Sequence, residues 1–301
     1  MLRWRLLLGT LLIAALVGLC WLDARASLPG AWLLPVALAA AALATREVLD
    51  LATLAQLRPL RGTVYCGNML AVLGSWLLTL RPVLERSVET HGAVQEWMIR
   101  GATGAGVFLA LGAAVLLVVL GELFRYRQPG GNMANLAAGV FAVVYVGLML
   151  SFAIQLRGYG LGALAAWILV VKMGDTGAYF TGRLFGKHKL APRISPGKTV
   201  EGAVGALACS CLGAWLAVTF FSPKIAQGST TGAWWGWVVF GLLVGTAGML
   251  GDLAESLLKR DVGVKDSSTW LPGFGGVLDI LDSLLLSAPV AWFCCALGLL
   301  R

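Results

Sequence analysis

Long apolar stretches recur along this 301-residue chain, and they constrain its fold more than any other feature. A helix needs about 20 predominantly apolar residues to cross the hydrocarbon core of a bilayer. Nine stretches approach that length, at 6–22, 31–45, 64–80, 102–121, 134–155, 160–174, 203–221, 234–250 and 283–300. In lipid every backbone N–H and C=O must be satisfied within the segment, so these stretches predict helices and not strands.

Charged residues are too few for a water-soluble protein. The chain is 58% hydrophobic and only 13% charged, whereas soluble domains carry about a quarter charged residues. This balance predicts an all-α, polytopic integral membrane protein with about nine transmembrane helices. We expect a single integral membrane domain over residues 1–301, with N-terminal transmembrane helices in 1–160 and the chemically active half in 161–301.

The first stretch has two interpretations. Arg3 and Arg5 precede an apolar run that ends near Ala24-Arg25-Ala26, a pattern typical of a cleaved signal peptide. The run is, however, longer than the roughly 7–15 apolar residues of most signal peptides. We therefore favour a retained membrane anchor over a cleaved signal.

Basic residues give a prediction of topology. With the N-terminus inside, 15 of the 23 Lys and Arg residues lie in inner segments and 7 in outer ones, in agreement with the positive-inside rule. The bias places two loops, 175–202 and 251–282, on the cytoplasmic side of what we expect to be a bacterial inner membrane. No basic stripe with interleaved aromatics is present in the sequence, so nucleic acid is not an expected partner.

The loop at 175–202 is rich in glycine and basic residues. Glycines let backbone amides approach an anion closely, and Lys and Arg supply countercharge. The triplet Gly197-Lys198-Thr199 is not a Walker A motif, because Pro192 stands where that motif requires glycine and no strand is expected before it. We expect a phosphate-binding turn at the start of the next helix, with a basic loop that binds no ligand as the alternative.

The loop at 251–282 holds most of the remaining charge. A helix would align four of its polar residues on one face, since they recur at i, i+3, i+4 and i+7: Asp252, Glu255, Ser256 and Lys259. Asp279, Asp282 and Ser283 repeat this spacing where the last apolar stretch begins. Residues 272–276 lie between the two patterns, and their glycine content predicts a re-entrant turn.

Carboxylates near the mouths of membrane helices are costly unless cations or metal compensate them. Oxygen ligands of this kind suit Mg²⁺. Mg²⁺ beside a basic, glycine-rich loop is typical of phosphoryl or nucleotidyl transfer. Two alternatives remain: a network of interhelical salt bridges, and an ion site in the broken helices of a transporter.

Six ordered motifs lie between residues 170 and 283. They are DTGAYF at 175–180, ISPGKT at 194–199, SLLKR at 256–260, VKDS at 264–267, LPGFGG at 271–276 and LDILDS at 278–283. Together they resemble the signature of the phosphatidate cytidylyltransferase (CDP-diacylglycerol synthase) family. The N-terminal half resembles that family only in helix count and hydrophobicity.

The resemblance implies a multi-helix, homodimeric membrane enzyme of phospholipid biosynthesis. Such an enzyme converts CTP and phosphatidic acid to CDP-diacylglycerol and pyrophosphate, with divalent metal on the positions of Asp252 and Asp279. Two residues depart from the pattern: Phe274 stands where the family has histidine, and Ile280 where it has arginine. We therefore expect a divergent member.

These considerations define a set of expected site residues. Mg²⁺, as one ion or a pair, is expected on Asp252, Asp279 and Asp282, with Glu255 beside it. The predicted catalytic residues are Asp252, Asp279, Asp282 and Lys259. The residues predicted to bind substrate or nucleotide are Asp175, Ser195, Lys198, Thr199, Ser256, Arg260, Lys265, Asp266, Gly275 and Gly276, with Arg183 and Lys187 assisting.

Membrane lipids, CTP and phosphatidic acid are the expected partners. A CTP-dependent lipid kinase, or a cytidylyltransferase acting on another lipid phosphate, would use a similar site. An ion-coupled transporter is the alternative from a different class of protein.

Overall fold

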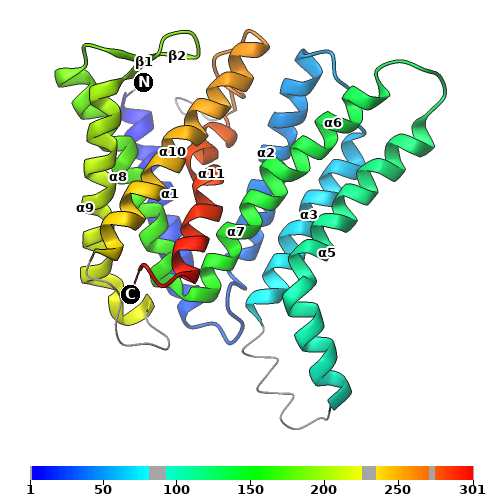
Figure 1. Ribbon diagram of the computed structural model, residues 1–301, viewed down its shortest axis with the longest axis horizontal. Helices are drawn as coiled ribbons and strands as arrows, with labels where there is room; N and C mark the ends of the chain where they lie inside the picture. The colour runs from blue at the N-terminus through cyan, green and yellow to red at the C-terminus, as the bar shows by residue number, and fades with distance from the viewer. Residues whose placement is uncertain (1, 81–92, 226–234, 271–274, 301) are drawn as a thin grey trace. The chain divides into compact units, whose positions relative to one another are not determined.

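The computed structural model describes residues 2–80, 93–225, 235–270 and 275–300 (Figure 1). It confirms the all-α class. The helices are α1 (Leu2–Ala24), α2 (Leu34–Leu54), α3 (Arg61–Thr79), α5 (Ala93–Arg125), α6 (Asn132–Ala142), α7 (Met149–Leu156), α8 (Leu161–Phe185), α9 (Val200–Ile225), α10 (Gly236–Asp261) and α11 (Leu278–Ala296). The π-helix η1 (Val143–Leu148) joins α6 to α7 without a break, so the nine predicted apolar stretches each correspond to one helical segment of the described chain.

Six of these segments are long and apolar enough to cross a membrane. They are Phe108–Arg125, Asn132–Tyr159, Leu161–Phe185, Val200–Phe220, Gly236–Asp261 and Leu278–Ala296, counted over the described residues. The chain is therefore an integral membrane protein, as its composition predicts.

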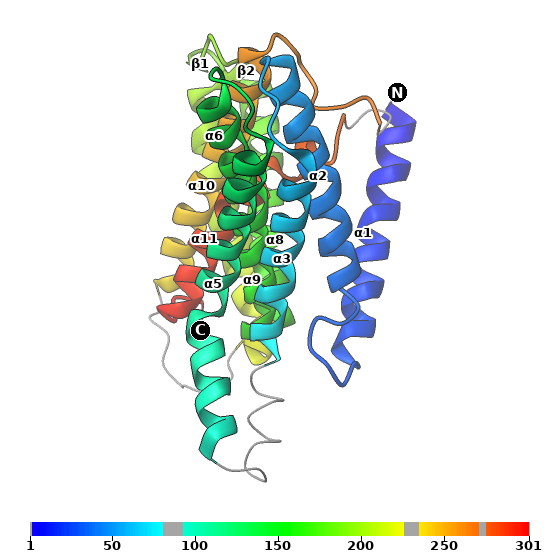
Figure 2. The same ribbon diagram turned by 90° about the vertical axis from the view of Figure 1, so that its right-hand side faces the viewer.

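Met1–Gly158 and Ser267–Val277 form one compact unit. Within it, α3 packs against α2 and α5 (Figure 2). It also packs against α7. The C-terminal end of α1 is fixed by Asp23, whose carboxylate pairs with Arg157 Nε at 2.6 Å and accepts hydrogen bonds from the Gly30 and Trp32 amides. Burying this carboxylate is tolerable because every partner is a charged or backbone donor.

Tyr159–Asp266 and Leu278–Arg301 form the second unit. Here α8 packs closely on α9, and α10 packs on α8, α9 and α11. A Cβ at Gly205 would collide with the Thr181 side chain, which shows why a small residue is needed where α8 meets α9. The strands β1 (Lys189–Ala191) and β2 (Ser195–Thr199) form an antiparallel hairpin between α8 and α9 (Figure 1).

Three expectations about local structure were wrong. Residues 175–185 belong to α8 and residues 251–261 to α10. The two connecting segments are therefore shorter than expected and span only residues 186–199 and 262–277. Polar residues at the membrane surface do not by themselves end a helix, because the hydrogen bonds within its backbone form in water as well as in lipid. The hairpin was not expected either, since strands of three and five residues are too short to give a periodic pattern.

Candidate active site

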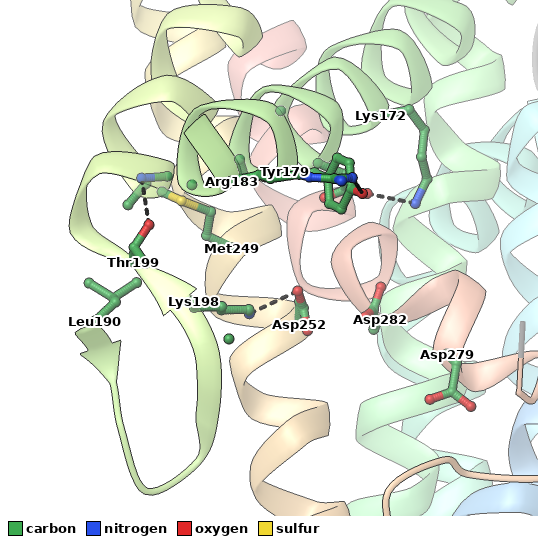
Figure 3. Close-up of a pocket in the computed structure, with 17 residues that line it drawn as sticks. Lys172, Tyr179, Arg183, Leu190, Lys198, Thr199, Met249, Asp252, Asp279 and Asp282 are labelled. Atoms are coloured by element: carbon green, nitrogen blue, oxygen red, sulfur yellow. Dashed lines mark hydrogen bonds and ion pairs between the residues drawn. The ribbon is translucent and has the colours of Figure 1, made fainter. Parts of the chain in front are cut away.

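A pocket of about 470 Å³ lies within the second unit (Figure 3). Its size falls in the range of about 300–1,000 Å³ typical of small-molecule sites. Its lining comes from α8, the hairpin, α9, α10 and the first turns of α11: Lys172, Gly174, Asp175, Ala178, Tyr179, Gly182, Arg183, Leu190, Gly197, Lys198, Thr199, Gly202, Ala203, Met249, Asp252, Asp279 and Asp282.

Four carboxylates and three cations share this pocket. Asp175 comes from α8, Asp252 from α10, and both Asp279 and Asp282 from the start of α11. The extension of α10 beyond its apolar stretch carries Asp252 to the pocket. The three cations are Lys172, Arg183 and Lys198. A pocket lined by both signs of charge is suited to a ligand that carries phosphates and metal together.

Lys198 projects from β2 toward Asp252 (Figure 3). Its ammonium nitrogen is buried and lies 2.8 Å from Asp252 Oδ2. Among the described residues no other polar atom binds this ammonium. Because an ammonium has three N–H donors, Lys198 retains donors for an anionic ligand.

Lys259 bridges two carboxylates beside the pocket. Its Nζ lies 2.7 Å from Glu255 Oε2 and 2.5 Å from Asp279 Oδ1. Glu255 is fully buried, and its Oε1 has no hydrogen-bond partner among the described residues. Lys259 is itself buried and does not line the pocket. The geometry thus supports a lysine that holds Asp279 in place rather than one that contacts a nucleotide.

Thr199 has a structural function at the pocket wall. It is buried, and its Oγ1 accepts a hydrogen bond from the Gly202 amide at 3.1 Å, which caps the first turn of α9. Gly186 and Gly202 both approach this side chain so closely that neither has free space for a Cβ. The hairpin is therefore anchored on Thr199, immediately after Lys198.

The structure brings only part of the predicted set together. Asp175, Lys198, Thr199, Asp252, Asp279 and Asp282 line the one pocket. The other predicted residues lie outside its lining: Ser195, Ser256, Lys259, Arg260, Lys265, Asp266, Gly275 and Gly276. The assisting residues divide in the same way, since Arg183 lines the pocket and Lys187 does not.

Several of the residues outside the lining have other contacts. Ser256 Oγ lies 3.4 Å from Asp252 Oδ1, and the exposed Arg260 donates to the Ile194 and Val264 carbonyls. Lys265 is exposed. Gly276 belongs to the first unit, where it packs against Glu47. Phe274 lies outside the described residues.

Two lining residues with polar side-chain groups, Lys172 and Tyr179, are not among the predicted site residues. Lys172 lies within an apolar stretch, and a charge in such a stretch is itself a signal of a functional site. Tyr179 gives no comparable signal, although its hydroxyl accepts a hydrogen bond from Arg183 at 2.8 Å.

The pocket suits Mg²⁺ in one particular way. Within the described residues, no group of three or more His, Cys, Asp or Glu side chains is already gathered as a metal site. Mg²⁺ usually binds one or two carboxylates together with substrate phosphates and water. One or two of the carboxylates Asp252, Asp279 and Asp282 are therefore enough for a metal that the protein shares with its ligand.

Comparison with known proteins agrees with the signature in the sequence. A family model described as the cytidylyltransferase family matches residues 4–297. The chain is 33% identical over 226 residues to a protein of Mycobacterium bovis named phosphatidate cytidylyltransferase, covering 71% of each chain. A protein of the same name from Mycobacterium leprae is 42% identical over 217 residues, 67% of each chain.

A third relative covers less. The phosphatidate cytidylyltransferase of Staphylococcus saprophyticus is 42% identical over 151 residues. The match spans 50% of this chain and 55% of the staphylococcal protein, so the chain matches about half the length of that relative.

Proposed function

Because the chain belongs to the cytidylyltransferase family, we propose that it transfers CMP from CTP to phosphatidic acid, giving CDP-diacylglycerol and pyrophosphate. The observation that carries this proposal is the pocket in which Asp175, Asp252, Asp279 and Asp282 lie with Lys198. Four carboxylates beside a lysine with available donors suit a metal-bound triphosphate.

The reaction makes modest demands on proton transfer. The acceptor is a phosphate monoester, whose second pKa is about 6, so it is largely dianionic at pH 7. An oxygen of this phosphate attacks the α-phosphorus of CTP. The new P–O bond replaces the bond to the β-phosphate, and pyrophosphate leaves. No general base is needed, and His188 is largely exposed and outside the pocket lining.

The side chains of the pocket would bring two anions together. Lys172, Arg183 and Lys198 reduce the repulsion between the acceptor phosphate and the triphosphate. Asp252, Asp279 and Asp282 would hold Mg²⁺, as one ion or a pair. When bound, the metal neutralises charge on the triphosphate and on the leaving pyrophosphate. Lys259 keeps Asp279 oriented toward this role.

We further propose that the hairpin and the 262–277 segment face the cytoplasm, in a bacterial inner membrane. The distribution of Lys and Arg supports this orientation, and CTP is made in the cytoplasm. A homodimer is proposed from the family resemblance alone.

A product assay tests the proposed function. Purified protein in lipid nanodiscs is given Mg²⁺ and CTP labelled at the α- or the γ-phosphate, with phosphatidic acid or diacylglycerol as acceptor. We expect α-label in the lipid, release of pyrophosphate, and loss of turnover on chelation of Mg²⁺.

Other outcomes of this assay would overturn the proposal. Transfer of γ-label to diacylglycerol with release of CDP would identify a lipid kinase. Lipid phosphates other than phosphatidic acid serve as a panel, and a clear preference for one of them would change the assigned substrate. Solute flux in proteoliposomes without any CTP turnover would indicate a transporter.

A further inference from the structure

Lys172 is a cation of the pocket that comes from inside a membrane span. It is the twelfth residue of α8, and it lies two residues before the end of the apolar stretch 160–174. An ionisable residue at such a position is costly unless it faces a polar cavity, and it usually marks a functional site. Lys172 meets this condition because it lines the pocket.

The Lys172 ammonium is fixed at the junction of α8 and the first turn of α11. Its Nζ lies 2.9 Å from Asp175 Oδ2, 3.2 Å from Ser283 Oγ and 3.5 Å from the carbonyl oxygen of Ile280. Ser283 Oγ also donates to Asp175 Oδ2 at 3.2 Å, which closes a three-membered polar cluster. The side chain is nevertheless 42% exposed, so the ammonium can exchange a protein acceptor for a ligand oxygen.

The backbone positions of the pocket cations lie at different distances from the polar end of α8, although the Lys198 ammonium reaches Asp252. Arg183 is two residues from the end of this helix, and Lys198 is on the hairpin that follows it. Lys172 is 13 residues before the end of the helix, about 20 Å along its axis at 1.5 Å per residue. Figure 3 shows Lys172 and Lys198 on different sides of Asp252 and Asp282. Lys172 is thus the pocket cation nearest to the apolar part of the span.

This difference in backbone position suggests a different substrate for each lysine. A nucleotide triphosphate reaches the pocket from water, on the side of the hairpin. The phosphate of a membrane lipid lies where apolar residues give way to polar ones, which is where Lys172 stands. Resting on the proposed function, we infer that Lys172 binds the phosphate of the lipid acceptor, whereas Lys198 serves the triphosphate. Ser283 and Asp175 hold the ammonium in position until the lipid phosphate arrives.

Kinetic constants for the two substrates test this assignment. Lys172→Met removes the charge and keeps most of the apolar side chain. Loss of a charge-assisted hydrogen bond to phosphate should raise the KM for phosphatidic acid by about 10- to 50-fold, with the KM for CTP changed by less than about 2-fold. Lys172→Arg keeps the charge and should recover most of this loss. Lys189→Met, which removes an exposed lysine outside the pocket lining, is the matched control.

Direct binding separates this inference from the proposed function. Binding of phosphatidic acid to the full chain is measured without CTP, against diacylglycerol with the same acyl chains. We expect Lys172→Met to abolish the preference for phosphatidic acid. An unchanged preference, or equal increases in both KM values, would overturn the role of Lys172. If the wild-type protein binds phosphatidic acid through Lys172 but never transfers CMP, the proposed function fails and the inference stands.

Discussion

Two buried carboxylates of the first unit and two pocket carboxylates of the second unit have different kinds of partners. In the first unit, Asp23 and Glu47 are buried and accept hydrogen bonds from backbone amides. Asp23 also pairs with Arg157, and Glu47 accepts a hydrogen bond from the Ser267 hydroxyl at 2.8 Å. Backbone amides cannot move away without unfolding, so these carboxylates are permanently engaged.

In the second unit, Asp252 and Asp279 line a pocket and each pairs with a lysine. Both carboxylates line a cavity, so they remain within reach of a metal or a phosphate-bound cation while the lysines hold them in position. For these four carboxylates, a place in the pocket wall with a lysine partner, rather than backbone-amide partners in the interior, distinguishes the carboxylate available for chemistry from the structural one.

The largest predicted effect is on turnover at Asp279. Asp279→Asn keeps the shape of the side chain but removes the charge that Lys259 and the proposed metal share. We expect kcat/KM for CMP transfer to fall by about 10³-fold, or about 4 kcal/mol of transition-state free energy, with little change in the unfolding temperature. The assay is run across a series of Mg²⁺ concentrations.

Asp261→Asn, an exposed carboxylate at the end of α10, is the control for this variant and should keep wild-type activity. Full activity of Asp279→Asn at ordinary Mg²⁺ would show that turnover does not need the charge of Asp279. It would contradict the assignment of Asp279 as a carboxylate available for chemistry.

The next effect is on stability at Asp23. Asp23→Ala leaves the Arg157 guanidinium, which is 15% exposed, and two backbone amides without their acceptor. Breaking a buried pair from one side should lower the free energy of unfolding by about 3 kcal/mol. The unfolding temperature in detergent measures this loss, and kcat of the protein that remains folded should be unchanged. A loss of kcat without a loss of stability would contradict a purely structural role.

The same residue bears on the first apolar stretch. Asp23 lies just before Ala24-Arg25-Ala26, so cleavage there would remove a carboxylate that fixes Gly30, Trp32 and Arg157. The interpretation as a retained anchor predicts that the intact mass of the protein purified from membranes includes α1. A mass lower by that of the residues of α1 would support cleavage of a signal peptide.

The nine helical segments of the described chain and the two charged segments were predictable, because long apolar stretches and clustered charges are local properties of the sequence. The ends of α8 and α10 were not, since hydropathy reports where the bilayer ends and not where the backbone hydrogen bonds end. Spacing at i, i+4 correctly placed Glu255 and Lys259 on one face, but it could not tell whether that face lines a pocket or is buried. That distinction depends on α11, which the sequence joins to α10 only through a glycine-rich segment.

Contacts between residues that are far apart in the sequence could not be predicted for the same reason. Glu47 binds Ser267 and the Val277 amide, which are 220 and 230 residues away along the chain. Its Oε1 lies 2.9 Å from the Val277 nitrogen, and a Cβ at Gly276 would collide with its carboxylate. One side chain thus holds both ends of the 267–277 segment, two residues before Asp279.

Glu47→Ala should therefore have an effect of intermediate size. Loss of the two hydrogen bonds to a charged acceptor should cost about 2 kcal/mol, and Glu47→Gln, which retains an acceptor, about half as much. Hydrogen exchange at the Val277 amide should accelerate in both variants, and more in Glu47→Ala than in Glu47→Gln. Wild-type protection of that amide in Glu47→Ala would show that the segment is held by other contacts.

The smallest effect is expected at Asp50, a carboxylate of the first unit that is not buried and, among the described residues, accepts no hydrogen bond from a backbone amide. It pairs with Arg61 at 2.6 Å, and both side chains are nearly half exposed. Exposed pairs contribute little, because water screens the charges and ordering two side chains costs entropy, so Asp50→Asn should change the free energy of unfolding by less than about 0.5 kcal/mol. The measurement is the same unfolding experiment as for Asp23→Ala, at low and at high salt. A loss of unfolding free energy as large as that of Asp23→Ala would contradict this view. It would mean that a carboxylate of the first unit contributes to stability whether or not it binds backbone amides.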